Sequence, residues 1–184
     1  MKRGFTSLAE EVLDAACEAA ASMGQTYIGT EHILAGLTDV DGCTAQKVLL
    51  KNGITGAGIR KMLNQPFEGA NGTVTSEGGS FSPMAEKLLN AAGEEAERYR
   101  SEYTGTEHIL LAMLKSEDCA ALRFLMGLGG NNQKIMADLF VAMGEDLKDH
   151  KSELGVDKNQ GGRQEEGILK NFSKDLCRMV KEGK

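Results

Sequence analysis

Tryptophan is absent from the sequence, and aromatic residues make up only 5% of its 184 residues. Apolar residues reach 41%, so a core can form, but its side chains must come mainly from alanine, leucine, isoleucine, valine and methionine. The sequence also lacks an apolar run of membrane-spanning length and a start that looks like a signal peptide. We therefore expect a cytoplasmic protein without a membrane partner, made of one compact domain plus a tail or of two very small domains.

Basic charge and paired cysteines are also scarce. The formal net charge is −6, and phosphate backbones are bound by basic surfaces, so nucleic acid is excluded as the main partner. The four cysteines include no CxxC pair, which favours reduced thiols in a cytosolic protein.

An internal repeat is the strongest positive feature. The block Gly-Thr-Glu-His-Ile-Leu at residues 29–34 returns unchanged at residues 105–110, 76 positions later. The same offset pairs Phe5 with Phe81 and many other residues between the two copies. Shared spacing over this length indicates one supersecondary unit used twice.

Each copy is predicted to form four helices, which gives an all-α fold of about eight helices. Thr6 and Ser82 are expected N-caps of the first helices, and Thr30 and Thr106 of the second. The third helices are expected to end before glycines in the left-handed conformation. The boundaries we predict are repeat 1 at about 4–65, a glycine-rich connector at 66–80, repeat 2 at about 81–142, a flexible linker at 144–167 and a last amphipathic helix at 168–184.

These features resemble the N-terminal domain of Clp chaperone ATPases, closest to the ClpC and ClpA branch, over roughly residues 3–142. The tail, with Leu169, Phe172 and Leu176, is similar to the segment that leads into the first AAA+ module. The resemblance implies that the two repeats pack as one domain, 1–143, about a pseudo-twofold axis, and that the chain is truncated before the ATPase module. It also implies docking of substrate and adaptor proteins, an ATPase ring and a partner peptidase.

An ATPase loop is not completed in this chain. Such a loop requires Gly-x4-Gly-Lys-Ser/Thr, so that backbone N–H groups and a lysine meet the phosphates. Arg178 stands where the first glycine would precede Gly183-Lys184, and no Ser or Thr follows. We therefore predict no catalytic residues, no enzyme activity and no cofactor in this chain; in the family, ATP and magnesium bind in the module that follows.

The repeated Thr-Glu pairs allow two interpretations. A glutamate in a first helical turn faces the positive end of the helix dipole, worth about 0.3–1 kcal/mol, and needs no ligand. The resemblance adds a second: some ClpC N-terminal domains bind phosphoarginine through an acidic residue at this position. Glu31 and Glu107 would then hold the guanidinium beside Thr30 and Thr106. Thr6 and Ser82 would contact the phosphate. Glu102, which is aligned with Thr26 of the first repeat, would repel the phosphate at the second site.

The repeated histidines and cysteines are expected to have structural roles. His32 and His108 lack further ligands at metal spacing, so we expect packing or backbone hydrogen bonds and no metal site. Cys43 and Cys119, each ahead of a third helix, are expected to be small buried residues. Two rivals stay open: a domain that docks adaptors only, without phosphoarginine, and a free-standing thiol-based redox protein that uses Cys43 and Cys119.

Overall fold

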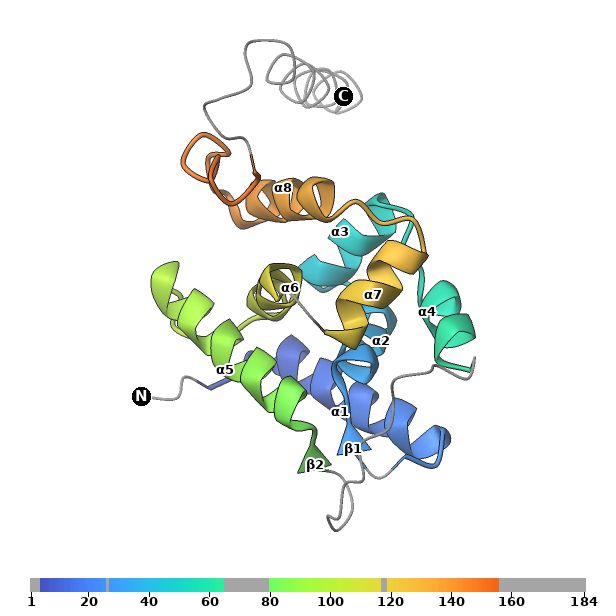
Figure 1. Ribbon diagram of the computed structural model, residues 1–184. Helices are drawn as coiled ribbons and strands as arrows, with labels where there is room; N and C mark the ends of the chain where they lie inside the picture. Colours follow the sequence, from blue (N-terminus) through green and yellow to red (C-terminus); the bar gives the residue numbers. More distant parts are fainter. Residues whose placement is uncertain (1–3, 26, 65–79, 117–118, 156–184) are drawn as a thin grey trace, which may run out of the picture. The chain divides into compact units, whose positions relative to one another are not determined.

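The computed structural model describes residues 4–25, 27–64, 80–116 and 119–155 (Figure 1). The chain divides into two units, Met1–Glu145 and Asp146–Lys184. The first unit contains both repeats, each with four helices within the described residues. The helices of repeat 1 are α1 (Ser7–Ser22), α2 (Thr30–Asp39), α3 (Thr44–Lys51) and α4 (Gly56–Leu63), and those of repeat 2 are α5 (Pro83–Arg98), α6 (Thr106–Lys115), α7 (Ala120–Gly127) and α8 (Asn132–Met143).

Helix ends follow the predicted caps in most places. Thr6 Oγ1 accepts a hydrogen bond from the backbone N–H of Ala9 in α1, and Ser82 Oγ does the same for Ala85 in α5, both at 3.2 Å. Gly53 and Gly129, directly beyond the C-caps of α3 and α7, have φ values of +78° and +82°. These predictions are confirmed. Glycine occurs at the two helix ends because it adopts the left-handed conformation without steric cost.

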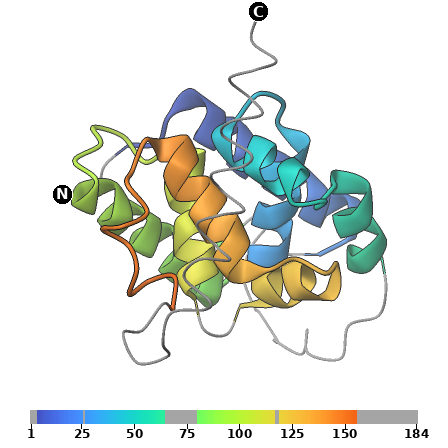
Figure 2. The ribbon, with the colours of Figure 1, turned by 90° about the horizontal axis from the view of Figure 1, so that it is seen from above.

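Each long first helix packs against the second helix of its own repeat. The two views show α1 beside α2 and α5 beside α6 (Figures 1 and 2). In repeat 1 the contact is very close, because a Cβ on Gly36 of α2 would overlap the carbonyl oxygen of Val12 in α1. Fully buried alanines face this contact, at Ala9 and Ala16 in α1 and at Ala85 and Ala92 in α5. Small side chains therefore allow the close helix–helix contact that the alanine-rich sequence predicts.

The repeats also contact each other reciprocally. α2 packs on α7 of repeat 2, and α6 packs on α3 of repeat 1. This arrangement is what the predicted pseudo-twofold relation requires. Both repeats therefore contribute to one buried core, with Ile33, Leu34 and Leu49 from repeat 1 and Ile109, Leu110 and Leu125 from repeat 2.

Two short strands, one near each repeat's first helix, pair with each other and connect the repeats; the sequence did not predict them. β1 (Tyr27–Ile28) pairs in parallel with β2 (Ser80–Phe81), with Ile28 opposite Phe81. The pseudo-symmetric counterpart is a single bridge between Phe5 and Thr104. Two-residue strands have no detectable period, so sequence patterns miss them. The all-α class is confirmed, with this small addition.

The predicted linker at 144–167 is described only as far as residue 155. Gly144 ends α8 in the left-handed conformation with φ +82°, and residues 147–155 form consecutive turns. His150 and Leu154 within these turns are buried. The rest of the linker, the predicted last helix at 168–184 and connector residues 65–79 lie outside the described residues.

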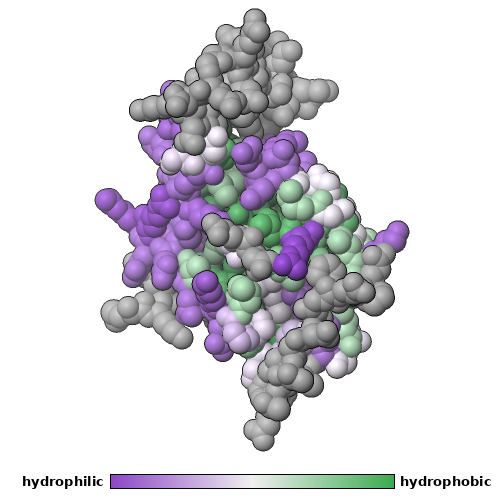
Figure 3. Space-filling model, in the orientation of Figure 1, coloured by the Kyte–Doolittle hydropathy of each residue, from purple (hydrophilic) through white to green (hydrophobic). Residues whose placement is uncertain are grey.

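The surface in Figure 3 carries its hydrophilic residues mainly on the left, around the C-terminal end of α5. Large apolar side chains that are exposed come partly in repeat-related pairs: Leu8 with Met84, and Leu50 with Met126. In the parts of the chain that the structure describes, no helix has the length and apolar character needed to span a membrane.

Candidate functional site

The two Gly-Thr-Glu-His blocks begin α2 and α6, but the N-cap is glycine rather than threonine. Gly29 and Gly105 are the N-caps, and Thr30 and Thr106 occupy the first helical positions. The backbone N–H of Gly29 donates to His32 Nδ1 at 2.9 Å, and Gly105 donates to His108 in the same way. The prediction that the threonines are N-caps is therefore wrong, because the histidine three residues after the N-cap satisfies the orphan N–H instead.

The threonine side chains have other partners. Thr30 Oγ1 accepts from the backbone N–H of Ala121 in α7 at 3.3 Å, so this buried hydroxyl caps a helix of the other repeat. Thr106 Oγ1 donates to Glu107 Oε2 at 3.4 Å. The first threonine thus joins the repeats, while the second lies against the candidate carboxylate.

Glycine at the N-cap leaves space for the glutamate carboxylate. A Cβ on Gly29 would overlap Glu31 Oε1, and one on Gly105 would overlap Glu107 Oε1. Both carboxylates therefore fold back over the starts of their own helices, where the dipole and the free N–H groups favour negative charge. This packing explains why glycine precedes the Thr-Glu pair in both copies.

Both carboxylates are partly exposed. The Glu31 and Glu107 side chains are 16% and 27% exposed. Their nearest charged or titratable contacts are His32 Nδ1 at 3.5 Å and His108 Nδ1 at 3.6 Å. Within the described part of the chain, no lysine or arginine pairs with either glutamate. Each carboxylate can therefore accept hydrogen bonds from an incoming cation.

The neighbouring histidines are neutral structural groups. Burial lowers the pKa of His32, opposed by the Glu31 charge, and burial lowers the pKa of His108, opposed by Glu107 and Glu95. Because Nδ1 accepts the glycine N–H, the neutral ring carries its proton on Nε2. The predicted role in backbone hydrogen bonding is confirmed. The described residues contain no group of three or more side chains that could hold a metal ion.

The strand pairing brings each glutamate near the long helix of the opposite repeat. The N–H of Ser82 donates to the carbonyl of Ile28 at 2.9 Å, which places the start of α5 beside the start of α2. The N–H of Thr6 donates to the carbonyl of Thr104 at 3.1 Å, which places the start of α1 beside that of α6. Each candidate site is therefore built from both repeats. Site 1 combines Glu31 with Ser82, and site 2 combines Glu107 with Thr6.

The cysteines have structural positions. Cys43 and Cys119 are the N-caps of α3 and α7, 0% and 2% exposed. Their Sγ atoms accept from the backbone N–H groups of Gln46 and Leu122 at 3.3 and 3.4 Å. These contacts confirm the prediction of small buried residues. They argue against the redox rival, since a reactive thiol has to be accessible.

The sequence matches the family described as Clp repeat (R) N-terminal domain over residues 4–128 and again over residues 80–181. The chain belongs to this family. The resemblance to the ClpC and ClpA branch is confirmed by relatives that match through their N-terminal regions only.

Two curated relatives illustrate the match. A "ClpA homolog" ATP-binding subunit of the ATP-dependent Clp protease from Cyanidium caldarium is 33% identical over 180 residues. The chloroplastic chaperone protein ClpC1 of Oryza sativa subsp. japonica is 31% identical over 180 residues. The match covers 98% of this chain but only 20% and 19% of these proteins, so the chain spans about one fifth of their length. Because ClpC1 is chloroplastic, the cytoplasmic location stays a prediction.

Solved structures share the fold. The N-terminal domain of ClpD from Arabidopsis thaliana has a TM-score of 0.64 at 24% identity, covering 76% of this chain and 94% of the other. A ClpV N-domain, solved in complex with a VipB peptide, has a TM-score of 0.59 at 17% identity, covering 76% and 87%. These likenesses establish the fold alone.

Proposed function

We propose that this domain docks substrate and adaptor proteins for a Clp-type unfoldase, and that Glu31 and Glu107 recognise phosphoarginine on those substrates. The observation that carries the second part is that each carboxylate is partly exposed, unpaired with lysine or arginine among the described residues, and set where two helix starts meet. On this proposal, ATP, magnesium, the ring and the peptidase belong to other modules or partners.

The chemistry of phosphoarginine fits this arrangement. A carboxylate accepts a bidentate pair of hydrogen bonds from a guanidinium. The start of α5 at site 1, and of α1 at site 2, offers N–H groups and a positive dipole end to the phosphate. Ser82 and Thr6 use their oxygens to cap these helices, and each hydroxyl hydrogen is available to donate to a phosphate oxygen.

Docking of whole proteins is supported by family likeness. The ClpV N-domain with the same fold was solved with a VipB peptide. By analogy, this domain takes peptide segments of partners as well as a single modified side chain. If phosphoarginine does not bind, docking of an adaptor alone is the function that replaces it.

Calorimetric titration with free phosphoarginine tests the proposal. We expect two sites in the parent protein. Glu31→Ala should weaken site 1 and Glu107→Ala site 2, each by about tenfold to a hundredfold, because a charge-assisted hydrogen bond is lost. Unmodified arginine should bind far more weakly, since it lacks the group that helix starts favour.

Matched controls are available in the first turns of α1 and α5. Glu10 and Glu86 are repeat-related, exposed and also in first helical turns. Glu10→Ala and Glu86→Ala remove a carboxylate near the proposed phosphate position without removing the acceptor of the guanidinium, so they should leave the affinity unchanged or raise it. Phosphoarginine that binds no better than arginine, or a double Glu31/Glu107 variant that binds like the parent, would rule out this recognition.

A further inference from the structure

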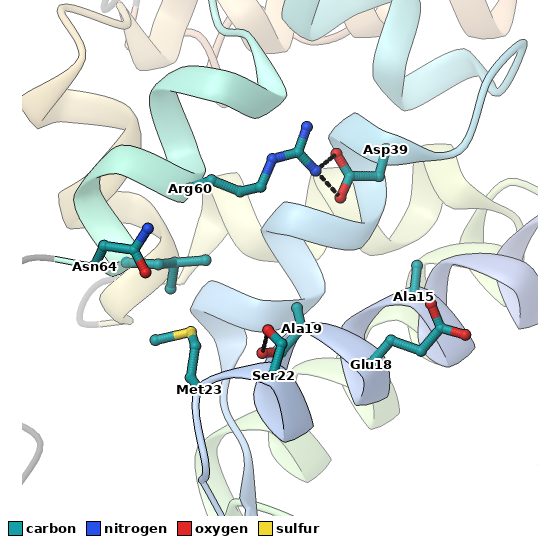
Figure 4. A pocket seen from close by; sticks show the side chains of 9 residues that line it. Ala15, Glu18, Ala19, Ser22, Met23, Asp39, Arg60 and Asn64 are labelled. Atoms are coloured by element: carbon teal, nitrogen blue, oxygen red, sulfur yellow. Dashed lines mark hydrogen bonds and ion pairs between the residues drawn. The ribbon is translucent and has the colours of Figure 1, made fainter.

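Repeat 1 has a groove away from the two candidate sites. It has a volume of about 380 Å³ and lies between the C-terminal half of α1, the end of α2 and α4 (Figure 4). Met23 and Leu63 give it apolar surface, and Asn64 stands at its edge. Arg60 reaches from α4 to Asp39 at the end of α2, where Nη1 lies 2.6 Å from both carboxylate oxygens.

In repeat 2 the corresponding positions carry larger side chains that pack together. Tyr99 stands where repeat 1 has Met23, and Phe140 where it has Asn64. The two rings lie 6.4 Å apart between centroids, and Phe140 is fully buried. An ion pair between Lys115 and Glu95, at 2.8 Å, closes the same region between α5 and α6. Repeat 2 thus shows which chemistry fills this position: an aromatic side chain.

The wall of the groove in repeat 1 is acidic. Glu18 lines the groove, and Asp14 and Glu11 precede it on the same side of α1 at helical spacing, all three exposed. Helix α1 contains no lysine or arginine. The charge of Arg60 is balanced by Asp39. A ligand in the groove therefore faces an apolar floor beside a row of negative charges that pair with no lysine or arginine in the described part of the chain.

We propose that this groove docks a basic peptide segment of a partner protein, which inserts one aromatic side chain where repeat 2 has its own. Basic side chains of the segment would face Glu18 and Asp14, as charge complementarity across an interface requires. The proposal rests on the docking role given above, but not on phosphoarginine, because the groove shares no residue with the Glu31 and Glu107 sites.

The test uses a fluorescein-labelled helical peptide of alanine and lysine with a single central phenylalanine, measured by fluorescence anisotropy. The parent protein should bind it, and peptides with Phe→Ala or with every Lys→Glu should bind much more weakly. The double variant Met23→Tyr/Asn64→Phe copies the repeat 2 side chains into the groove. It should weaken binding by about tenfold or more, because the aromatic side chain loses its buried position.

Charge reversal gives a matched pair of variants. Glu18→Lys should weaken binding several-fold at low salt, and the loss should shrink at high salt as charges are screened. Glu94→Lys changes the repeat-related exposed residue of α5 and should leave binding unchanged. Phosphoarginine titration of the filled variant should match the parent, which separates failure of the groove from failure of the other sites.

Four outcomes would overturn the proposal. The parent could fail to bind the phenylalanine peptide, or the filled variant could bind it as tightly as the parent. Glu94→Lys could weaken binding as much as Glu18→Lys, which would show that overall charge and not the groove attracts the peptide. If the parent protein sediments as a dimer and the filled variant sediments as a monomer, the occupant of the groove is a second copy of the chain instead.

Discussion

The two repeats are nearly alike at their helix starts and differ at the far ends of their long helices. Both copies place a glutamate carboxylate over an N-cap glycine and bond that glycine to a histidine. At the other end, repeat 2 buries Phe140 against Tyr99, whereas repeat 1 has a groove beside Met23 and Asn64. At the helix starts, backbone hydrogen bonding and the space beside the N-cap glycine favour the same residues in both repeats. At the far ends, side chains of different volume are tolerated.

The contacts between the repeats show the same contrast. Asp138 of α8 is buried and accepts hydrogen bonds at 2.8 Å from Lys51 at the end of α3 and from Asn52, the C-cap of that helix. The repeat-related residues are Met62 and Gly127, where a Cβ on the glycine would come 2.8 Å from the methionine Cε. One interface is therefore polar and the other apolar, although their backbones are related.

Separating the repeats should have the largest effect. The core and both strand contacts are shared, so a fragment of residues 1–68 should be unfolded or oligomeric, whereas residues 1–143 should melt in one cooperative step. Circular dichroism and sedimentation check both. Two well-separated transitions in the longer fragment would show that the repeats are independent domains.

Truncating the aromatic of repeat 2 should destabilise the protein far more than changing its counterpart. Phe140 is fully buried, so Phe140→Ala should lower the free energy of unfolding by about 3–5 kcal/mol. Asn64 is exposed, so Asn64→Ala should change it by less than about 0.5 kcal/mol. Urea denaturation measures both. Equal losses would mean that the groove of repeat 1 is as tightly packed as repeat 2.

Removing the buried carboxylate between the repeats should have an intermediate effect. Asp138→Ala eliminates hydrogen bonds from Lys51 and Asn52 and should cost about 1.5–3 kcal/mol in the free energy of unfolding. Lys51 is half exposed and returns to water, which limits the loss. A change below about 0.5 kcal/mol in urea denaturation would show that the polar contact contributes little.

The sequence predicted the helices and their caps better than the contacts between the repeats. Thr6, Ser82 and the third-helix glycines were assigned correctly because caps and left-handed turns depend on local residues. The Thr30 assignment failed because the N–H of Gly29 bonds to His32 and the Glu31 carboxylate occupies the space where an N-cap side chain would lie. The cross-repeat pairing of Ile28 with Phe81 depends on tertiary contact and has no period to detect. The groove had a sequence signal, namely that Met23 and Asn64 stand where the aligned repeat 2 has the aromatic residues Tyr99 and Phe140.

The smallest expected effect is a pH dependence from the buried histidine that each repeat carries. Burial lowers the pKa of His32 and His108 below the ordinary value of 6.5. As the pH falls through 6.5, unfolded chains bind protons at these rings while folded chains do not. Stability is therefore full above this pH and is lost as the pH decreases toward the lowered folded values. One carboxylate, Glu31, opposes the shift of His32, whereas Glu107 and Glu95 both oppose that of His108.

His32→Gln and His108→Gln should each reduce the pH dependence, because each removes one ring whose pKa burial lowers. Glutamine at this position can still accept the N–H of the N-cap glycine, so it removes the titration without removing the bond. Urea denaturation at about pH 7.5 and about pH 5.5 gives the slope, in a range where most carboxylates stay ionised. A double variant that retains the full slope of the parent would place the pH dependence outside these two rings.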